Sequence, residues 1–249
     1  MVLALILGLI VGSFLNAVIF RLSTGESFLS GRSHCPRCGH KLTAVDLIPV
    51  LSFIFLRGKC RYCKSKISWQ YPLIELATAI SFILLAQNFE FRISNFEFIA
   101  QAIFICFLIV ISIYDLKHYL ILDKVVFPAL VLSIAYNLLI GQLVSGILGA
   151  VLVSGFFYLQ YLFSKGRWIG FGDVKFGLLL GSLFGFPLAL LVLLLAYCSG
   201  AMVGVSLIAL GKKKLSSKLP FGTFLGFSAI IVLLYGDQIW NWYMKLIGF

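Results

Sequence analysis

Long apolar stretches alternate with short polar segments along nearly the whole chain. Most of these stretches reach the roughly 17–25 residues that a helix needs to cross a bilayer. The pattern predicts spans at 1–20, 72–88, 98–114, 125–141, 143–163, 174–186, 187–210 and 219–235. The sixth stretch is short, and its boundary with the seventh, at Phe186-Pro187, is the least defined. We therefore expect an all-α, polytopic membrane helical bundle of about eight transmembrane helices.

The composition agrees with this class. Hydrophobic residues make up 61% of the 249 residues and charged residues only 12%, whereas a soluble domain is about 45–50% apolar and about 25% charged. Residues 1–20 are apolar almost from the start, with no basic segment before them and no small-residue cleavage site after them. We interpret them as a retained span and not as a signal peptide.

The distribution of the net charge of +11 along the chain is explained by membrane topology, so the charge gives no reason to expect a nucleic-acid partner. Eight crossings place four polar segments on one side of the membrane, and these segments hold 18 of the 20 lysines and arginines: 21–71, 115–124, 164–175 and 211–218. The other side keeps only Arg92 and Lys245. Because positively charged loops stay in the cytoplasm, we expect the four basic segments to be cytoplasmic and the N-terminus to face out.

Two aspartates lie at the cytoplasmic ends of different predicted spans. Asp115, in "IVISIYDLKHYLILD", ends the third span, and Asp173, in "GFGD", begins the sixth. Two crossings separate them, so both lie on the same side and at the same depth. Two converging carboxyls share one proton. The ionised one can then activate a water while the protonated one polarises a carbonyl, as in aspartic proteases.

The residues around these aspartates admit a structural reading as well. We expect Gly170 and Gly172 to allow close backbone approach and a non-helical entry, which places Asp173 at a helix start where the dipole favours its anion. The alternative is that Asp115 and Asp173 only cap helices at the water interface. For Asp123 in the neighbouring turn we expect capping of the fourth span, and for Lys175 an ordinary interfacial lysine.

The large cytoplasmic loop 21–71 contains two Cys-x-x-Cys pairs with 21 residues between them: Cys35, Cys38, Cys60 and Cys63. Two such pairs predict a zinc-ribbon-like site in which four thiolates hold a structural zinc ion. Disulfides are the alternative, but they rarely persist in the cytoplasm. His34 and His40 are neighbours or substitute ligands. Cys106 and Cys198 lie in predicted spans, and we expect both to be buried.

The segment between the two pairs, "DLIPVLSFIFLRG", is too apolar for a free linker and too short to cross a membrane. We expect it to lie along the membrane surface, in contact with lipid, or to pack against the bundle.

Taken in order, several motifs carry a family resemblance. They are "GSFLNAVIFRL" at 12–22, the two cysteine pairs, "IPVLSFIFLRGKCRYCKSKISWQYPLIEL" at 48–76, "YDLKHYLILD" and "GFGDVK". Together they resemble the bifunctional type IV prepilin peptidases over nearly the whole chain. The resemblance implies an aspartic endopeptidase of the bacterial inner membrane. Such an enzyme removes the basic leader of prepilins or pseudopilins at the cytoplasmic face and methylates the new N-terminal residue with S-adenosylmethionine.

The resemblance also implies roles for regions and residues. It places the catalytic pair on Asp115 and Asp173, in a peptidase core at 98–249. It assigns methyl transfer to the N-terminal region 1–97, with these matching residues: Asn16, Arg21 and Glu75. One departure is Leu122, where the family often has proline. Because no glycine-rich nucleotide fingerprint is present, S-adenosylmethionine rests on the resemblance alone.

Other readings differ in identifiable features. A presenilin-like intramembrane aspartic protease shares "YD" and "GxGD" but not the cysteine loop, and it would cut inside a substrate span. A zinc-stabilised membrane assembly factor would use the aspartates only as caps, so it would keep its function without them. A proton-coupled transporter would need acids near mid-membrane and inverted repeats, and the sequence shows neither.

Overall fold

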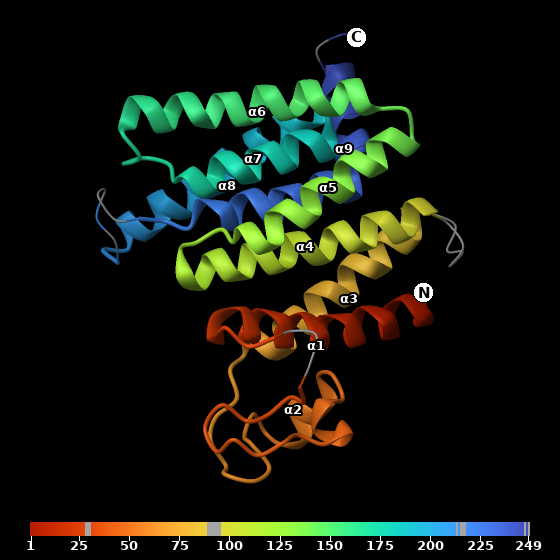
Figure 1. Cartoon of the computed structure of the whole chain (residues 1–249), viewed down its shortest axis with the longest axis vertical. Helices are drawn as coiled ribbons and strands as arrows, with labels where there is room; N and C mark the ends of the chain where they lie inside the picture. Colours follow the sequence, from red (N-terminus) through yellow and green to blue (C-terminus); the bar gives the residue numbers. More distant parts are fainter. Residues whose placement is uncertain (28–30, 89–95, 213, 215–217, 247, 249) are drawn as a thin grey trace. The chain divides into compact units, whose positions relative to one another are not determined.

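The structure, a computed structural model, describes residues 1–27, 31–88, 96–212, 214, 218–246 and 248. Among these residues the only β-structure is a pair of isolated bridges, so the all-α prediction is confirmed. The helices are α1 (Val2–Thr24), the 3-10 helix η1 (Ala44–Leu47), α2 (Leu51–Phe55), α3 (Gln70–Asn88), α4 (Phe96–His118), α5 (Asp123–Leu139), α6 (Leu143–Ser164), α7 (Phe171–Phe184), α8 (Leu188–Ala209) and α9 (Phe221–Leu246) (Figure 1).

Each of the eight predicted spans coincides with one of these helices. Among the described residues, six helices are long and apolar enough to cross a membrane: α1, α3, α4, α6, α8 and α9. The other two, α5 and α7, have 17 and 14 residues. The least defined boundary falls where it was expected, since α7 ends at Phe184, Gly185 adopts a positive φ of 60°, and α8 begins at Leu188. Arg92 lies outside the described residues.

The chain divides into two compact units, Met1–Cys106 and Phe107–Phe249, and the division falls inside α4. In the first unit α1 packs along α3 (Figure 1). Two glycines of α1 make this packing close: a Cβ on Gly8 would lie 2.5 Å from Ala79 Cα, and one on Gly12 would lie 2.7 Å from Glu75 Cα. Small residues at a crossing allow two membrane helices to bring their backbones together.

In the second unit α5, α6, α8 and α9 all pack against α7. The α6–α7 crossing is tight because Gly149 faces Gly181. Polar contacts add to the α5–α7 crossing, where Asn137 Nδ2 donates to the Ser182 carbonyl at 2.6 Å. The inner face of α7 is fully buried at Phe176, Leu179 and Leu180. Protein therefore surrounds much of this short helix, which explains how it can begin with a carboxylate.

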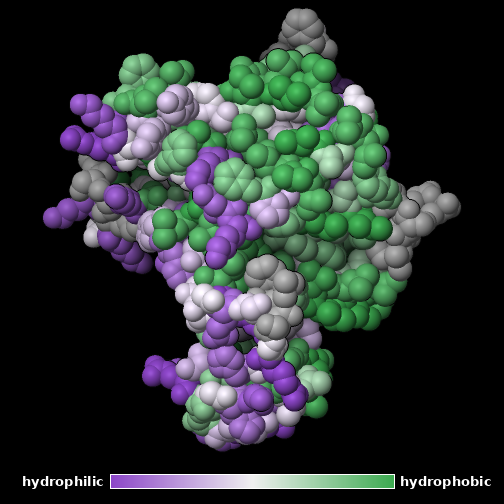
Figure 2. Space-filling model, in the orientation of Figure 1, coloured by the Kyte–Doolittle hydropathy of each residue, from purple (hydrophilic) through white to green (hydrophobic). Residues whose placement is uncertain are grey.

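Large apolar side chains cover the outward faces of the long helices. On α6, for example, Val144, Val151 and Phe163 are exposed, and Figure 2 shows hydrophobic residues spread over the helices in this view. One expectation was wrong: Cys198 is exposed on α8, while Cys106 is only partly buried. In a membrane helix an apolar or weakly polar side chain can face lipid, so an apolar pattern alone does not predict burial.

Candidate active site and metal centre

Asp115 lies in the last turn of α4 and is only 5% exposed. Its Oδ2 accepts two hydrogen bonds from one residue of α9, because Thr223 approaches with its backbone N–H at 2.7 Å and its hydroxyl at 3.1 Å. The same hydroxyl lies 3.0 Å from the carbonyl oxygen of Ser112, one turn before Asp115. The carboxyl group is thus held between α4 and the first turn of α9.

Asp173 is the third residue of α7 and is half-buried. Gly170 is the N-cap, with φ −78° and ψ 156°, and its N–H donates to Asp173 Oδ2 at 3.0 Å. The expected helix start is therefore present. Gly172, however, is inside the helix and gives no non-helical entry. What its missing side chain provides is space, because a Cβ there would lie 3.1 Å from the Cβ of Ile121.

The two aspartates come together around Ile121. This side chain lies against Gly172, beside Asp173, and also against Gly222, beside Thr223. A Cβ on Gly222 would lie 2.9 Å from Ile121 Cδ1 and 3.0 Å from Asp115 Oδ2. The two carboxylates are near enough for the charge of Asp115 to act on Asp173. In each the Oδ2 atom accepts a hydrogen bond from a backbone N–H.

Asp123 and Lys175 form an ion pair that the sequence did not predict. Asp123 is not a cap, since the N-cap of α5 is Leu122. Instead its two carboxylate oxygens accept from Lys175 Nζ at 2.8 and 2.7 Å. The ammonium also lies over the rings of Phe171 and Phe127, 5.2 and 5.8 Å from their centroids. The pair joins α5 to α7 two residues beyond Asp173.

The four cysteines of the loop form one cluster: the Sγ atoms of Cys35, Cys38, Cys60 and Cys63 all lie within 4.8 Å of one another. All four are free thiols, and the Sγ atoms of Cys35 and Cys63 are 3.9 Å apart. Since Zn–S bonds of about 2.3 Å in a tetrahedron separate the sulfurs by about 3.8 Å, the cluster fits zinc. A disulfide would require about 2.05 Å.

Each cysteine pair sits in its own tight turn. The Gly39 N–H donates to the Cys35 carbonyl at 2.8 Å, and the Lys64 N–H donates to the Cys60 carbonyl at 3.0 Å. The hydroxyl of Ser65, 3.1 Å from Cys63 Sγ, is the main cause that lowers the pKa of Cys63 to about 6. A thiolate is the form that binds metal.

The two histidines beside the cluster contact other side chains. His34 lies 3.9 Å from Glu26, and the ring of His40 stacks on Tyr62 with centroids 3.6 Å apart. They are neighbours of the thiolates, outside the group of four that could hold an ion.

Asn16 forms a polar cluster with Gln70 and Tyr71 where α1 packs against α3, and Glu75 lies further along the same crossing, against Gly12. Asn16 and Glu75 are both almost fully buried. Asn16 Nδ2 donates to the Tyr71 carbonyl at 3.0 Å, and its Oδ1 accepts from Gln70 Nε2 at 3.3 Å. Glu75 Oε2 accepts the Val50 N–H at 2.7 Å, which ties α3 to the start of α2. Gln70 Oε1 is buried and has no hydrogen-bond partner among the described residues. The cluster therefore offers an unused acceptor.

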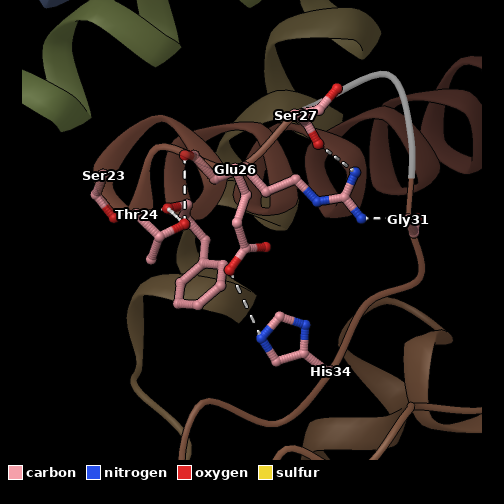
Figure 3. Close-up of polar contacts among 8 residues, drawn as sticks. Ser23, Thr24, Glu26, Ser27, Gly31 and His34 are labelled. Atoms are coloured by element: carbon pink, nitrogen blue, oxygen red, sulfur yellow. Dashed lines mark hydrogen bonds and ion pairs between the residues drawn. The ribbon is translucent and has the colours of Figure 1, made fainter.

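Arg21 has a different set of contacts. Its guanidinium, near the end of α1, donates to the carbonyl oxygens of Ser27 and Gly31 at 3.2 and 2.8 Å (Figure 3). These bonds hold the beginning of the cysteine loop against the end of α1. Two of the three residues predicted for methyl transfer, Asn16 and Glu75, thus lie at the α1–α3 crossing, and the third, Arg21, lies where the cysteine loop begins.

Two family models match the chain, one over the part that contains the four cysteines and one over the part that contains the two aspartates. Residues 6–89 match the bacterial peptidase A24 N-terminal domain, and residues 102–205 match the type IV leader peptidase family. The chain is 33% identical to a prepilin leader peptidase/N-methyltransferase of Aeromonas salmonicida, over 98% of this chain and 94% of that protein. The chain belongs to the type IV leader peptidase family. The resemblance seen in the motifs is confirmed.

Further members show the same extent of similarity. Proteins with the same name from Pseudomonas aeruginosa and Bacillus subtilis are 32% and 33% identical, over 98% and 97% of this chain and 93% and 96% of their own lengths. No solved structure matches the chain. Membership in this family and the six long apolar helices in the described residues together identify a multi-pass inner-membrane enzyme of the peptidase class.

The structure also shows residues around Asp115 that the sequence reasoning missed. Gly222 and Thr223 stand in "LPFGTF" at the entry of the last span, directly after the basic segment 211–218. The predicted topology already placed that entry on the same side as Asp115 and Asp173. A small residue and a hydroxyl at that depth were therefore a usable signal.

Proposed function

We propose that this chain removes the basic leader of prepilins or pseudopilins at the cytoplasmic edge of the membrane and then methylates the new N-terminal residue. The observation that carries the proposal is the approach of Asp115 and Asp173 around Ile121, in a chain that aligns with named prepilin peptidases over nearly its whole length. Two carboxylates within electrostatic reach of each other can share a proton and activate water, as aspartic proteases do.

In the proposed reaction the two carboxyl groups share one proton. The ionised carboxylate takes a proton from water, and the resulting hydroxide attacks the scissile carbonyl carbon. The protonated carboxyl donates its proton to the carbonyl oxygen as the tetrahedral intermediate forms. When the C–N bond breaks, the carboxyl that took the proton from water returns it to the leaving amine. Backbone N–H groups hold the Oδ2 atoms of both residues, and we assign the exchange of protons with the reacting groups to the Oδ1 atoms.

The location of the pair suits this substrate. A prepilin leader is short, basic and cytoplasmic, and an apolar helix follows it. Asp115 ends α4 and Asp173 begins α7, so the pair lies where a cytoplasmic leader would meet a membrane helix. The enzyme is itself basic, so recognition depends on local acids and on the apolar helix of the substrate, not on net charge.

The cysteine cluster supports a structural zinc site. Four thiolates close a tetrahedral site and leave no open position for a substrate, so the zinc holds the loop together. The loop also exposes large apolar side chains on and near α2: Ile48, Leu51, Ile54, Phe55 and Trp69. Along the chain, five basic residues lie between Phe55 and Trp69, and Trp69 directly precedes α3. We assign this surface to contact with membrane lipid.

For methyl transfer we propose the N-terminal region 1–97. S-adenosylmethionine would supply the methyl group. The polar cluster of Asn16 and Gln70 fits a ligand that carries N–H donors, because Gln70 Oε1 is a buried acceptor without a partner in the described residues. The Glu75 carboxylate would hold the freshly exposed ammonium group of the substrate. Arg21 is assigned to this region by resemblance.

The proposal is tested by co-expressing the chain with a prepilin and measuring the N-terminus of the product by mass spectrometry. We expect a product that lacks the leader and carries one methyl group on its first residue. Full-length prepilin would refute the peptidase proposal, and trimmed but unmethylated product would refute methylation. Cleavage within the apolar helix would instead favour a presenilin-like activity.

A further inference from the structure

Thr223 makes an unusual set of contacts for a buried threonine. It is 5% exposed, and both its backbone N–H and its hydroxyl point to a single oxygen, Oδ2 of Asp115. The residue comes from α9, 108 positions further along the chain. A threonine at the start of a helix commonly bonds to its own backbone. Here both donors are turned to another helix and to one of the two aspartates.

The backbone before Thr223 is built for this approach. A Cβ on Gly222 would lie 2.9 Å from Ile121 Cδ1, closer than real Cβ atoms come, and 3.0 Å from Asp115 Oδ2, tighter than nearly all real Cβ contacts. Glycine at this position lets the first turn of α9 reach the carboxylate. Further along the same crossing, Gly226 lies against Ser112 of α4. The α4–α9 crossing thus fixes Thr223 beside Asp115.

The Thr223 hydroxyl has two partners at nearly equal distances, Asp115 Oδ2 at 3.1 Å and the Ser112 carbonyl at 3.0 Å. A hydroxyl has one proton to donate and can also accept. When Asp115 is ionised, that proton can point to Oδ2. When Asp115 carries a proton on Oδ1, Oδ2 is neutral and a weaker acceptor, and the hydroxyl proton can turn to the Ser112 carbonyl. The Thr223 backbone N–H stays on Oδ2 in both states, so one rotation about the C–O bond adjusts the hydroxyl to the charge of Asp115.

We propose that Thr223 is a positioning residue for catalysis, whose hydroxyl follows the protonation state of Asp115 during the reaction. The inference rests on the proposed peptidase function. The geometry also assigns the reacting oxygen of Asp115. Because Thr223 holds Oδ2 in both protonation states, Oδ1 remains the oxygen that exchanges a proton with water. Asp173 has no such partner in the described residues, because its Oδ2 is held by the N–H of Gly170.

The test measures cleavage of a synthetic prepilin peptide by the purified full-length enzyme in lipid vesicles. In Thr223→Val the shape stays while the hydroxyl is lost, and we expect kcat to fall by about 10- to 100-fold, the value of a hydrogen bond to a charged group, with little change in KM. Thr223→Ser restores the hydroxyl and should restore kcat. The matched control is Ser133→Ala, which removes another buried hydroxyl of the same unit, 2.5 Å from Ser182 Oγ.

The outcomes separate the inference from the proposed function. If the wild-type enzyme does not cleave, the proposed function fails. If it cleaves and Thr223→Val matches its kcat, or Thr223→Ser loses as much kcat as Thr223→Val, the inference alone is wrong. Should Thr223→Val fail to fold, as judged by its melting temperature, Thr223→Ala is compared with Thr223→Ser, and equal kcat for these two would likewise overturn the inference.

Discussion

The metal centre of the first unit and the aspartate pair of the second unit are assembled in different ways. The cysteines come in two short turns, each closed by its own backbone hydrogen bond, so each pair is nearly complete by itself. The aspartates lie on α4 and α7, and Asp115 is held by α9. The difference shows that local chain geometry forms the cysteine cluster, whereas helix packing positions the proposed catalytic pair. The two should therefore be separable by mutation.

The largest expected effect is on the metal. In Cys60→Ser a buried ligand is lost, and three thiolates cannot close a tetrahedral site, so zinc should fall from about one per chain to near zero. Elemental analysis of the purified protein measures this. Prepilin cleavage should persist, because Asp115 and Asp173 belong to the other unit.

Cys198→Ser is the control for that experiment, since Cys198 is an exposed thiol outside the cluster. Its zinc content should equal that of the wild type. If Cys60→Ser loses cleavage together with its metal while Cys198→Ser keeps both, the two sites are coupled and the comparison above is wrong.

Glu75→Gln should separate the two activities inside one enzyme. The amide oxygen of glutamine can still accept the Val50 N–H, so the link between α3 and α2 survives while the negative charge is lost. We expect trimmed but unmethylated pilin in mass spectra of the mature N-terminus. Glu26→Gln, which removes an acid of the same unit near His34, is the control and should leave methylation unchanged.

Two results would change the role of Glu75. Fully methylated product from Glu75→Gln would remove this residue from the methyl-transfer site. Loss of cleavage as well as methylation would show that its bond to Val50 supports the fold.

The smallest expected effect concerns the ion pair of Asp123 and Lys175. Because Asp123 is largely exposed, their coupling should be only about 0.2–1 kcal/mol. We expect Asp123→Asn and Lys175→Met each to lower the rate of cleavage a few-fold, and the double variant to lose little more than either one. A double-mutant cycle measures this. Additive losses would show that the two residues act separately and that the pair does not hold the start of α7.

The sequence predicted what depends on local pattern and topology. The length of the apolar stretches located the helices, including the boundary between α7 and α8. The spacing of Cys35, Cys38, Cys60 and Cys63 predicted a cluster that the structure contains. The even number of crossings placed Asp115 and Asp173 at one depth, and in the structure Ile121 lies against both Gly172, beside Asp173, and Gly222, which adjoins Asp115.

What the sequence could not predict depends on which helix faces meet. Nothing in "LPFGTF" says that Thr223 turns toward α4, because that follows from the close approach permitted by Gly222 and Gly226. Asp123 was expected to cap a helix, but the position of α7 gives it Lys175 as a partner. Likewise Cys198 was expected to be buried, yet its face of α8 is exposed.

The most direct test of the central claim is the cleavage of a synthetic prepilin by purified Asp115→Asn and Asp173→Asn variants in lipid vesicles. Each asparagine keeps the size of the side chain but removes the shared proton, so the cleavage rate should fall by at least about 100-fold in either variant. Zinc content and melting temperature, measured on the same samples, should match the wild type. Substantial cleavage by either folded, zinc-loaded variant would contradict the account.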